Sequence, residues 1–249
     1  MMGANHAITG AAAWVAVTST ATGALGLVPM EPGEMLVGML VAAGAALLPD
    51  ADHPNATIAY SVPLIGSAGA SAVSGMVGGH RHGTHSLLSI PVIALIAWVL
   101  QFGIADVTWW ERPIAWVPAL AVVALVCFAA KAMKLVVSWP KAWVAGATVG
   151  ALVLLFAPED PFWLQLAIVL GFVIHLAGDM LTVGGLPLLW PWNPKPPKAW
   201  RKTPVRYFWM PNGYFALPVL GKTGSILEWL LGAAVTAYLA WVLIGSFVE

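Results

Sequence analysis

The sequence predicts an all-α polytopic membrane protein, a helical bundle of about seven transmembrane helices in a single domain over residues 1–249. Three observations support this: 60% of the residues are hydrophobic, only 9% are charged, and the mean hydropathy is +0.84. Soluble domains contain about 25% charged residues, so the composition excludes the ordinary soluble classes. The single cysteine, Cys127, excludes a disulfide framework and a cysteine-rich zinc site.

Seven apolar segments come close to the roughly 20 residues that a membrane span requires. Prolines fall near their ends, where proline disturbs a helix least. No basic stretch precedes the first segment, so we interpret it as a retained span and not as a signal peptide. The glycine- and serine-rich stretch 61–79 is expected to be a mobile loop. The predicted spans are approximately 7–28, 34–49, 85–104, 114–130, 142–157, 162–182 and 225–247.

Seven crossings place the N-terminus and the loops 50–84, 131–141 and 183–224 on one side of the membrane. Ten of the eleven basic residues then fall on that side, and only Arg112 falls on the other. The positive-inside rule therefore predicts that this side is the cytoplasm of a multi-pass inner or plasma membrane protein. The same side receives every histidine and four acids: His6, His53, His80, His82, His85, His175, Asp50, Asp52, Asp179 and Glu228.

The second span ends in Leu-Pro-Asp-Ala-Asp-His-Pro, residues 48–54. The two prolines predict irregular backbone, so that Asp50, Asp52 and His53 can converge on one cation or bridge two. The alternative is a polar helix end among lipid headgroups. Acids at a helix C-terminus oppose the macrodipole, however, and this favours a compensating cation.

The third span begins with Gly-His-Arg-His-Gly-Thr-His-Ser, residues 79–86. Three histidines within six residues on a glycine-rich turn are typical of a metal-binding loop. We predict His80 and His85 as ligands and regard His82 as a weaker candidate. Thr84 could cap the helix, and Arg81 could hold a phosphate or serve as a positive-inside anchor.

His175 and Asp179 are four residues apart in the sixth span, so they share one helix face. Ionisable residues inside an apolar span are costly and usually functional. The pair can chelate a metal, or Asp179 can orient the histidine; the alternative is an internal His–Asp hydrogen bond. Ser225 to Glu228 matches a capping box, but the grouping with the other acids favours a catalytic or bridging Glu228. The same grouping favours His6 as a ligand, although Asn5 could simply cap the first helix.

The segment from Leu186 to Trp209 is rich in proline, tryptophan and basic residues. Such composition is typical of a loop in the membrane interface, where cations attract anionic lipid. The segment could also cover the site and hold a phosphate-bearing substrate.

These motifs resemble the YdjM-type inner-membrane proteins of bacteria and archaea, described as membrane-bound metal-dependent hydrolases and regulated by LexA in some bacteria. The resemblance implies an all-helical membrane fold with a hydrolase-type metal site. Position 82 departs from the motif, and residues 106–165 match none of its elements. The matching elements are Asn5-His6, residues 48–54, 79–86, His-Leu-Ala-Gly-Asp-Met-Leu-Thr (175–182), Gly-Leu-Pro-Leu-Leu-Trp-Pro (185–191) and, more weakly, 222–228.

The helix with His175 and Asp179 is more distantly similar to zinc-dependent phospholipase C and the single-strand nucleases related to it. This likeness implies that both residues are metal ligands. It also implies the companions Asp50, His85, His6 and Glu228.

The favoured hypothesis is a metal-dependent hydrolase that cleaves a phosphoester of a lipid or amphiphilic substrate at the cytoplasmic interface. Mixed histidine and carboxylate ligands suit two or more zinc ions, with manganese or iron as alternatives. Asp50 or Asp52 would bridge the ions, Glu228 or Asp52 would be the general base, and Arg81 would hold the phosphate. Membrane lipid is the expected partner, and nucleic acid is not expected. The predicted metal ligands are His6, Asp50, His53, His80, His85, His175 and Asp179.

A metal or ion transporter and a metal-dependent membrane sensor are the alternatives. A transporter needs polar residues along a path through the membrane, whereas these residues gather at one face, which favours the enzyme. A helical scaffold with a structural metal is the third possibility, but structural sites usually use four ligands, fewer than this chain offers.

Overall fold

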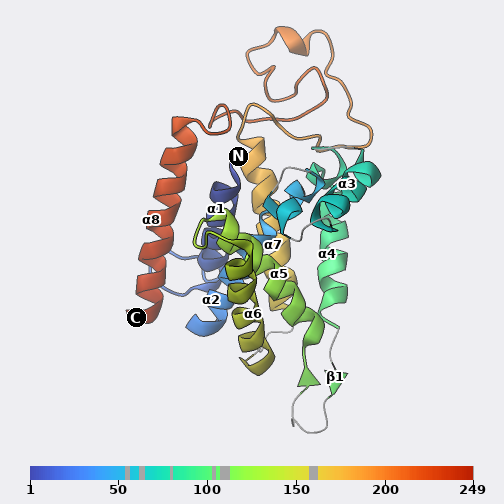
Figure 1. Cartoon of the computed structure of the whole chain (residues 1–249). Coiled ribbons are helices and arrows are strands. Elements are labelled where there is room, and N and C mark those ends of the chain that lie inside the picture. Colours follow the sequence, from blue (N-terminus) through green and yellow to red (C-terminus); the bar gives the residue numbers. More distant parts are fainter. Residues whose placement is uncertain are drawn as a thin grey trace.

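The computed structural model describes residues 1–53, 57–61, 65–78, 81–102, 105–106, 113–156 and 162–248. Helices dominate the described residues, and most of them run along one common direction (Figure 1). Two strands of two residues each, β1 (Ala105–Asp106) and β2 (Pro113–Ile114), pair antiparallel at one end of the bundle. The α-helices are α1 (Gly3–Thr18), α2 (Pro32–Ala45), α3 (Ile65–Val77), α4 (Ser89–Leu100), α5 (Trp116–Ala132), α6 (Trp139–Phe156), α7 (Trp163–Met180) and α8 (Ile226–Val248).

The predicted all-helical class is confirmed, and each of the seven predicted segments contains a helix. The number of spans is not confirmed. In the described part of the chain, three helical segments are long and apolar enough to cross a membrane: Pro32–Asp52, Trp163–Met180 and Ile226–Val248. A helix as short as α4, with 12 residues, is only about 18 Å long, against about 30 Å of hydrocarbon.

Two local predictions were wrong, one on a loop and one on the end of a helix. The stretch expected to be a mobile loop contains α3, which lies across the end of the bundle (Figure 1). The first helix ends at Thr18 instead of continuing to residue 28. Gly23 and Gly26 adopt positive φ angles of 89° and 57°, a conformation that favours glycine, and the chain turns back along the helix. Leu25 then donates to the carbonyl of Ala16 at 2.7 Å.

The helices α1 and α7 both pack closely against α2. A side chain at Gly10 would place its Cβ 2.7 Å from the carbonyl oxygen of Ala42, and one at Gly171 would place it 2.3 Å from the same oxygen. Glycine at both positions therefore lets two helix backbones approach α2, as is common between membrane helices. This packing brings the first turn of α1, the end of α2 and the last turns of α7 together.

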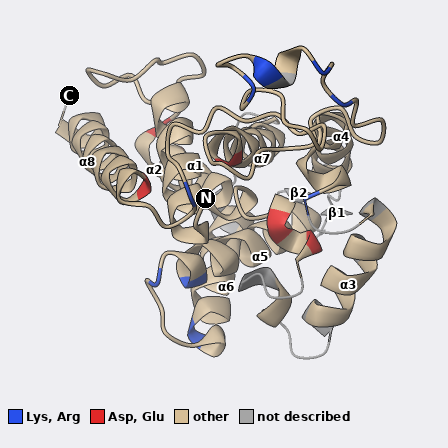
Figure 2. Ribbon diagram, turned by 90° about the horizontal axis from the view of Figure 1, so that it is seen from above, with Lys and Arg blue, Asp and Glu red and all other residues tan. Residues whose placement is uncertain are grey.

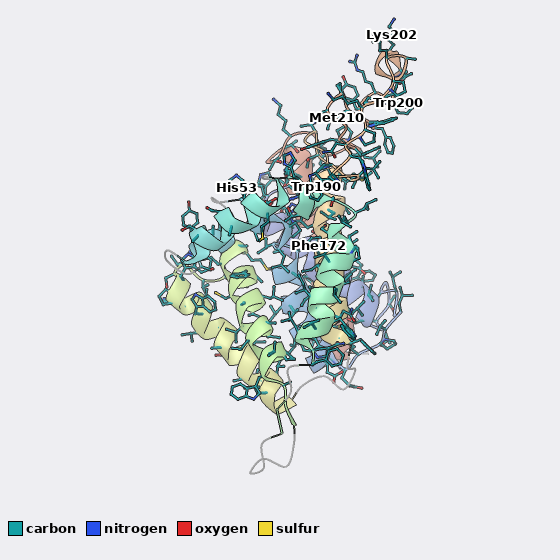
Figure 3. All side chains as sticks on the ribbon, turned by 90° about the vertical axis from the view of Figure 1, so that its right-hand side faces the viewer. His53, Phe172, Trp190, Trp200, Lys202 and Met210 are labelled. Atoms are coloured by element: carbon teal, nitrogen blue, oxygen red, sulfur yellow. The ribbon has the colours of Figure 1, made fainter. Side chains whose placement is uncertain are left out.

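The segment Val183–Gly224 covers that end of the bundle (Figure 1). Seen from this end, lysines and arginines lie on the segment and at the turn between α5 and α6 (Figure 2). Figure 3 shows that Trp200, Lys202 and Met210 lie on the part that projects from the bundle, whereas Trp190 lies close to it. Exposed aromatic rings such as Trp192, Tyr207 and Phe208 are typical of a membrane interface.

Candidate metal centre

Five titratable side chains from four elements converge beneath this segment. They form two groups that could hold a metal ion, and His175 belongs to both. His6 lies within the first turn of α1, not before the helix as expected. His85 lies in the 3-10 turn η3 (Gly83–His85) and not at the start of α4. The groups are His6, His175 and Asp179, and Asp50, His85 and His175, with Asp50 in the 3-10 turn η1 (Pro49–Asp52).

Four ligand atoms meet at the centre of the cluster. The Nε2 atoms of His85 and His175 are 3.3 Å apart. Asp50 Oδ1 lies 3.6 Å from the first and 3.8 Å from the second. Asp179 Oδ2 lies 3.8 Å from each of them. Both histidines and Asp179 are almost fully buried, whereas the side chain of Asp50 is 27% exposed, so the cluster opens on the side of Asp50.

Hydrogen bonds assign the proton on each of these two imidazoles. His175 Nδ1 lies 2.7 Å from the carbonyl oxygen of Ala46, which can only accept, so Nδ1 carries the hydrogen. Thr84 donates its hydroxyl to Asp52 Oδ2 at 2.5 Å and must therefore accept from His85 Nδ1, 2.9 Å away. In the neutral imidazoles both Nε2 atoms then bear lone pairs. Two such nitrogens facing two carboxylate oxygens require a cation between them.

Without a metal, His85 itself is the residue best placed to carry that positive charge. Burial alone would lower the pKa of His85, but its contacts with the carboxylates of Asp50 and Asp52 outweigh burial and hold the pKa above its usual range. The cluster is therefore built for a positive charge, either a proton or a metal ion.

His6 forms the second wall of the cluster. Its ring stacks on that of His175 with centroids 3.7 Å apart, and its Nε2 lies 3.2 Å from Asp179 Oδ1. The amino group of Met1 also contacts this oxygen. Within the described structure, His6 Nδ1 is buried without a hydrogen-bond partner, and Asp179 Oδ2 is buried with only its ion pair to Arg81. Buried ligand atoms of this kind are the ones that a bound ion would satisfy.

Arg81 lies at the mouth of the cluster. Its guanidinium nitrogen Nη2 is 3.1 Å from Asp179 Oδ2, and its side chain is 25% exposed. The backbone holds it there, since its N–H donates to Asp52 at 3.2 Å and its carbonyl accepts from the Tyr214 hydroxyl at 3.2 Å. A cation beside the cluster and partly open to solvent can contact an anionic ligand, as predicted.

Asp52 and Glu228, the two predicted general bases, serve other contacts. Asp52 is fully buried and accepts from Thr84 and from the backbone of Arg81, so it orients the loop that bears His85. Glu228 accepts from Asn5 Nδ2 at 2.8 Å and from the backbone N–H groups of Met2 and Gly224 at 2.6 and 2.7 Å. Its own N–H donates to Ser225 at 3.2 Å. Glu228 thus caps the start of α8, which was the alternative to a catalytic role, and its carboxylate also joins α8 to α1 through Asn5.

Two further residues, His53 and His80, were predicted as ligands. His53, which follows η1, lies at the same end of the bundle (Figure 3), but neither metal-binding group of the described residues includes it. His80 lies outside the described residues. Sequence reasoning missed the carbonyl of Ala46 and the acceptor role of Thr84, because neither a backbone oxygen nor a threonine in a turn has a distinctive pattern.

The Thr84 contacts lead to a first expected result. Thr84→Val keeps the shape of the side chain but removes the acceptor of His85 and a donor to Asp52. We expect metal affinity to fall by roughly 10- to 100-fold, the usual effect of losing a partner that orients a ligand. Titration of the metal-depleted protein with zinc measures this. Thr84→Ser is the matched control and should bind as the wild type does; equal losses in both variants would contradict the role of the hydroxyl.

The fold and the cluster define a helical membrane protein with a buried histidine–aspartate site at one end of its bundle. The family model described as YdjM inner membrane protein matches residues 1–247, and the chain belongs to this family. The resemblance inferred from the motifs is thereby confirmed. No curated protein and no solved structure matches the chain.

Proposed function

We propose that the chain is a membrane-embedded metal-dependent hydrolase that cleaves a phosphoester of a lipid or amphiphilic substrate at the cytoplasmic interface. One observation carries the proposal: Nε2 of His85, Nε2 of His175 and one oxygen each of Asp50 and Asp179 converge, with Arg81 beside them. This set combines ligands for a divalent cation with a cation for an anionic substrate.

Zinc bonds of about 2.0–2.1 Å separate tetrahedral ligand atoms by about 3.3–3.4 Å. Five of the six separations among the four atoms run from 3.3 to 3.8 Å, close to these values. Asp50 and Asp179 belong to different groups, so the two imidazoles with one of these carboxylates would begin a zinc site. Histidine with carboxylate suits zinc, and manganese or iron are alternatives.

A second ion would use His6. The Nδ1 atom of His175 is engaged by Ala46, so this imidazole has only one nitrogen for a metal. Asp179 instead has an oxygen toward each group: Oδ2, which also contacts Arg81, lies near His85 and His175, and Oδ1, which also contacts Met1, lies beside His6. We therefore assign the bridging role to Asp179 and not to Asp50 or Asp52, and His6 Nε2 with Asp179 Oδ1 would begin the second site.

A divalent cation held by these histidines and aspartates would supply Lewis acidity toward a phosphoryl oxygen and lower the pKa of a bound water. The chain's own residues do the rest. Arg81, whose side chain is 25% exposed, binds and orients the phosphate with its guanidinium group. Thr84 and Ala46 hold both imidazoles in the ligating tautomer. Tyr214 holds the backbone of Arg81 from the covering segment.

The placement at one end of the bundle supports an interfacial enzyme over a transporter. In the described residues the buried histidines and acids are His6, Asp52, His85, His175, Asp179 and Glu228, and contacts join them at that end. Described lysines and arginines lie on the covering segment and at the turn between α5 and α6 (Figure 2), and the positive-inside rule would make the covered end the cytoplasmic one.

Turnover by the purified protein tests the proposal. With zinc or manganese in detergent, the wild type should release product from phospholipids or alkyl phosphates, and a chelator should abolish this. Arg81→Gln should lower kcat/KM about 100-fold, as for loss of one transition-state donor. Arg206→Gln removes an exposed arginine that pairs with Tyr207, and it should keep full activity.

Sealed vesicles of both orientations, given a membrane-impermeant substrate, test the sidedness. Only inside-out vesicles should turn it over. No metal-stimulated turnover on any phosphoester, or equal losses in Arg81→Gln and Arg206→Gln, would refute the proposed activity.

A further inference from the structure

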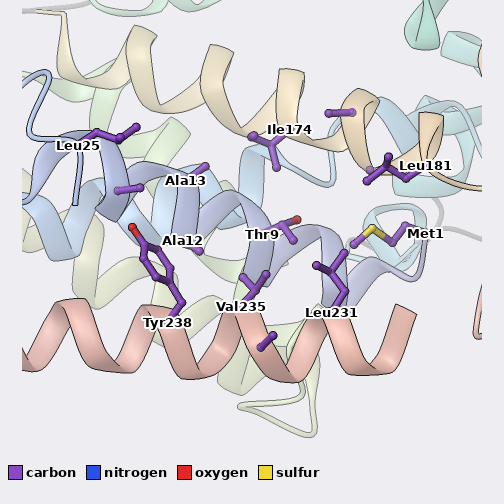
Figure 4. A pocket seen from close by; sticks show the side chains of 14 residues that line it. Met1, Thr9, Ala12, Ala13, Leu25, Ile174, Leu181, Leu231, Val235 and Tyr238 are labelled. Carbon is purple, nitrogen blue, oxygen red and sulfur yellow. The ribbon is translucent and has the colours of Figure 1, made fainter. Parts of the chain in front are cut away.

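An elongated apolar cavity of about 580 Å³ lies between α1, α7 and α8 (Figure 4). Leu25 and Tyr238 lie at one end of it, and Met1 and Leu181 lie at the other. Along α8 it extends from Leu231 to Tyr238, roughly 10 Å of helix. The cavity is thus long, narrow and parallel to helices of the bundle.

The walls of the cavity offer no polar group to a ligand along its length. The hydroxyl of Thr9 donates to the carbonyl oxygens of Asn5 and His6 in its own helix, at 2.8 and 3.0 Å. The hydroxyl of Tyr238 donates to the carbonyl of Gly23 at 3.2 Å. A cavity lined in this way holds hydrocarbon better than water. The contact of Tyr238 with Gly23 lies at the end that is remote from the cluster.

The other end of the cavity meets the metal-binding cluster. Gly178 lines the cavity, and a Cβ at this position would lie 3.2 Å from His6 Cε1 and 2.9 Å from Met1 Sδ. The next residue in the chain is Asp179, whose carboxylate belongs to the cluster. Gly178 and Met1, which both line the cavity, therefore also lie beside His6.

The side of the cavity opens toward the lipid. Ala177 and Ala234 line it and are exposed. α8 is the most apolar of the three candidate spans, and only 17% of its apolar window is buried. In a member of an inner-membrane family, an exposed face of this kind is covered by lipid tails. A chain can therefore enter sideways from the bilayer.

We propose that this cavity binds the hydrocarbon chain of the substrate, and the proposal rests on the proposed function. The chain lies between α1, α7 and α8, and its anionic headgroup reaches past Gly178 to the cluster and Arg81. The substrate class is therefore an amphiphile with a long hydrocarbon chain next to the phosphoester, drawn from the membrane and not from solution.

Photolabelling tests this directly. The probe is hexadecyl phosphate with a diazirine on its chain, added to the full-length protein in detergent. We expect labels on peptides that contain residues 9–16, 174–181 and 231–238, with hexadecyl phosphate competing and ethyl phosphate or inorganic phosphate failing to compete. Ala234→Trp should reduce this labelling at least about tenfold by filling the cavity. Ala233→Trp, the same change at the neighbouring exposed position outside the cavity lining, should leave it unchanged.

The outcomes separate this inference from the proposed activity. Cavity labelling of a wild-type protein that shows no turnover supports the binding site and counts against the hydrolase, whereas labelling that persists in an inactive His175→Ala supports both. Turnover that is equally fast for ethyl and hexadecyl phosphates, or that is unchanged in Ala234→Trp, overturns the binding site and leaves the hydrolase standing. Labels spread evenly over the exposed faces of all helices, or a cross-linked dimer that excludes the probe, also overturn it.

Discussion

Purified His175→Ala is expected to retain less than roughly one-tenth of the divalent metal bound by the wild type, because it lacks the residue shared by both groups of ligands. The Nε2 atom of His175 lies within 3.8 Å of ligand atoms from His85, Asp50 and Asp179. Asp179→Ala should have a similar effect, because both oxygens of this carboxylate lie close to nitrogen atoms of the predicted histidine ligands. Elemental analysis of the detergent-purified proteins, each expressed in metal-supplemented cells, measures the metal content per chain.

His53→Ala is the informative control for this experiment. His53 follows Asp52 in the same motif as Asp50, and the motif alone favours it as a ligand, but it is outside both groups of the described residues. We expect this variant to keep its metal. Metal-free wild type, or an equal loss of metal in His53→Ala and His175→Ala, would refute the assigned centre.

Glu228→Ala is expected to have the largest effect on stability. It leaves three buried or partly buried N–H donors, from Met2, Asn5 and Gly224, without their carboxylate acceptor. The loss should destabilise the fold by about 3 kcal/mol or more. For a chain of this size that corresponds to a fall in Tm of roughly 10 °C. Cys127, the only cysteine and fully buried, reports unfolding when a thiol-reactive dye is present.

Glu228→Gln separates the structural role from the catalytic role that the sequence predicts. Glutamine keeps one acceptor oxygen and most of the contacts, so its Tm should lie between those of wild type and Glu228→Ala. If Glu228 only ties α8 to α1, Glu228→Gln should keep the metal content and the turnover of the wild type at low temperature. A Glu228→Gln protein that is stable but inactive would instead restore Glu228 as the general base.

The helical class and the family were predictable because they depend on properties that accumulate along the chain. Composition and apolar runs indicate whether a helix must be stable in lipid or in water. Short motifs such as residues 48–54 and 175–182 indicate the family because they follow one another in a set order along the chain. The lengths of the helices were less predictable. The first helix ends at Thr18 although the apolar run continues, and the chain turns back through positive φ angles at Gly23 and Gly26.

Part of the candidate site also followed from the sequence. The spacing of His175 and Asp179 alone puts them on one face of α7, and this pair is part of the observed cluster. His6, Asp50 and His85 were predicted from their common side of the membrane, and the structure brings them to the same place. His53, Asp52 and Glu228 were predicted on that same side of the membrane. A common side is therefore too coarse a criterion to separate a metal ligand from a neighbouring residue.

The sequence by itself determined the helical class and the family, and it predicted that the histidines and several acids gather toward one face. Only the tertiary structure decided which atoms of these residues meet. Close packing of α1 and α7 on Ala42 sets the relative height of three helices, and the Ala46 carbonyl and Thr84 turn two imidazoles toward each other. Such choices depend on distances of a few ångströms between segments that are far apart in the chain, and no local pattern of residues encodes them.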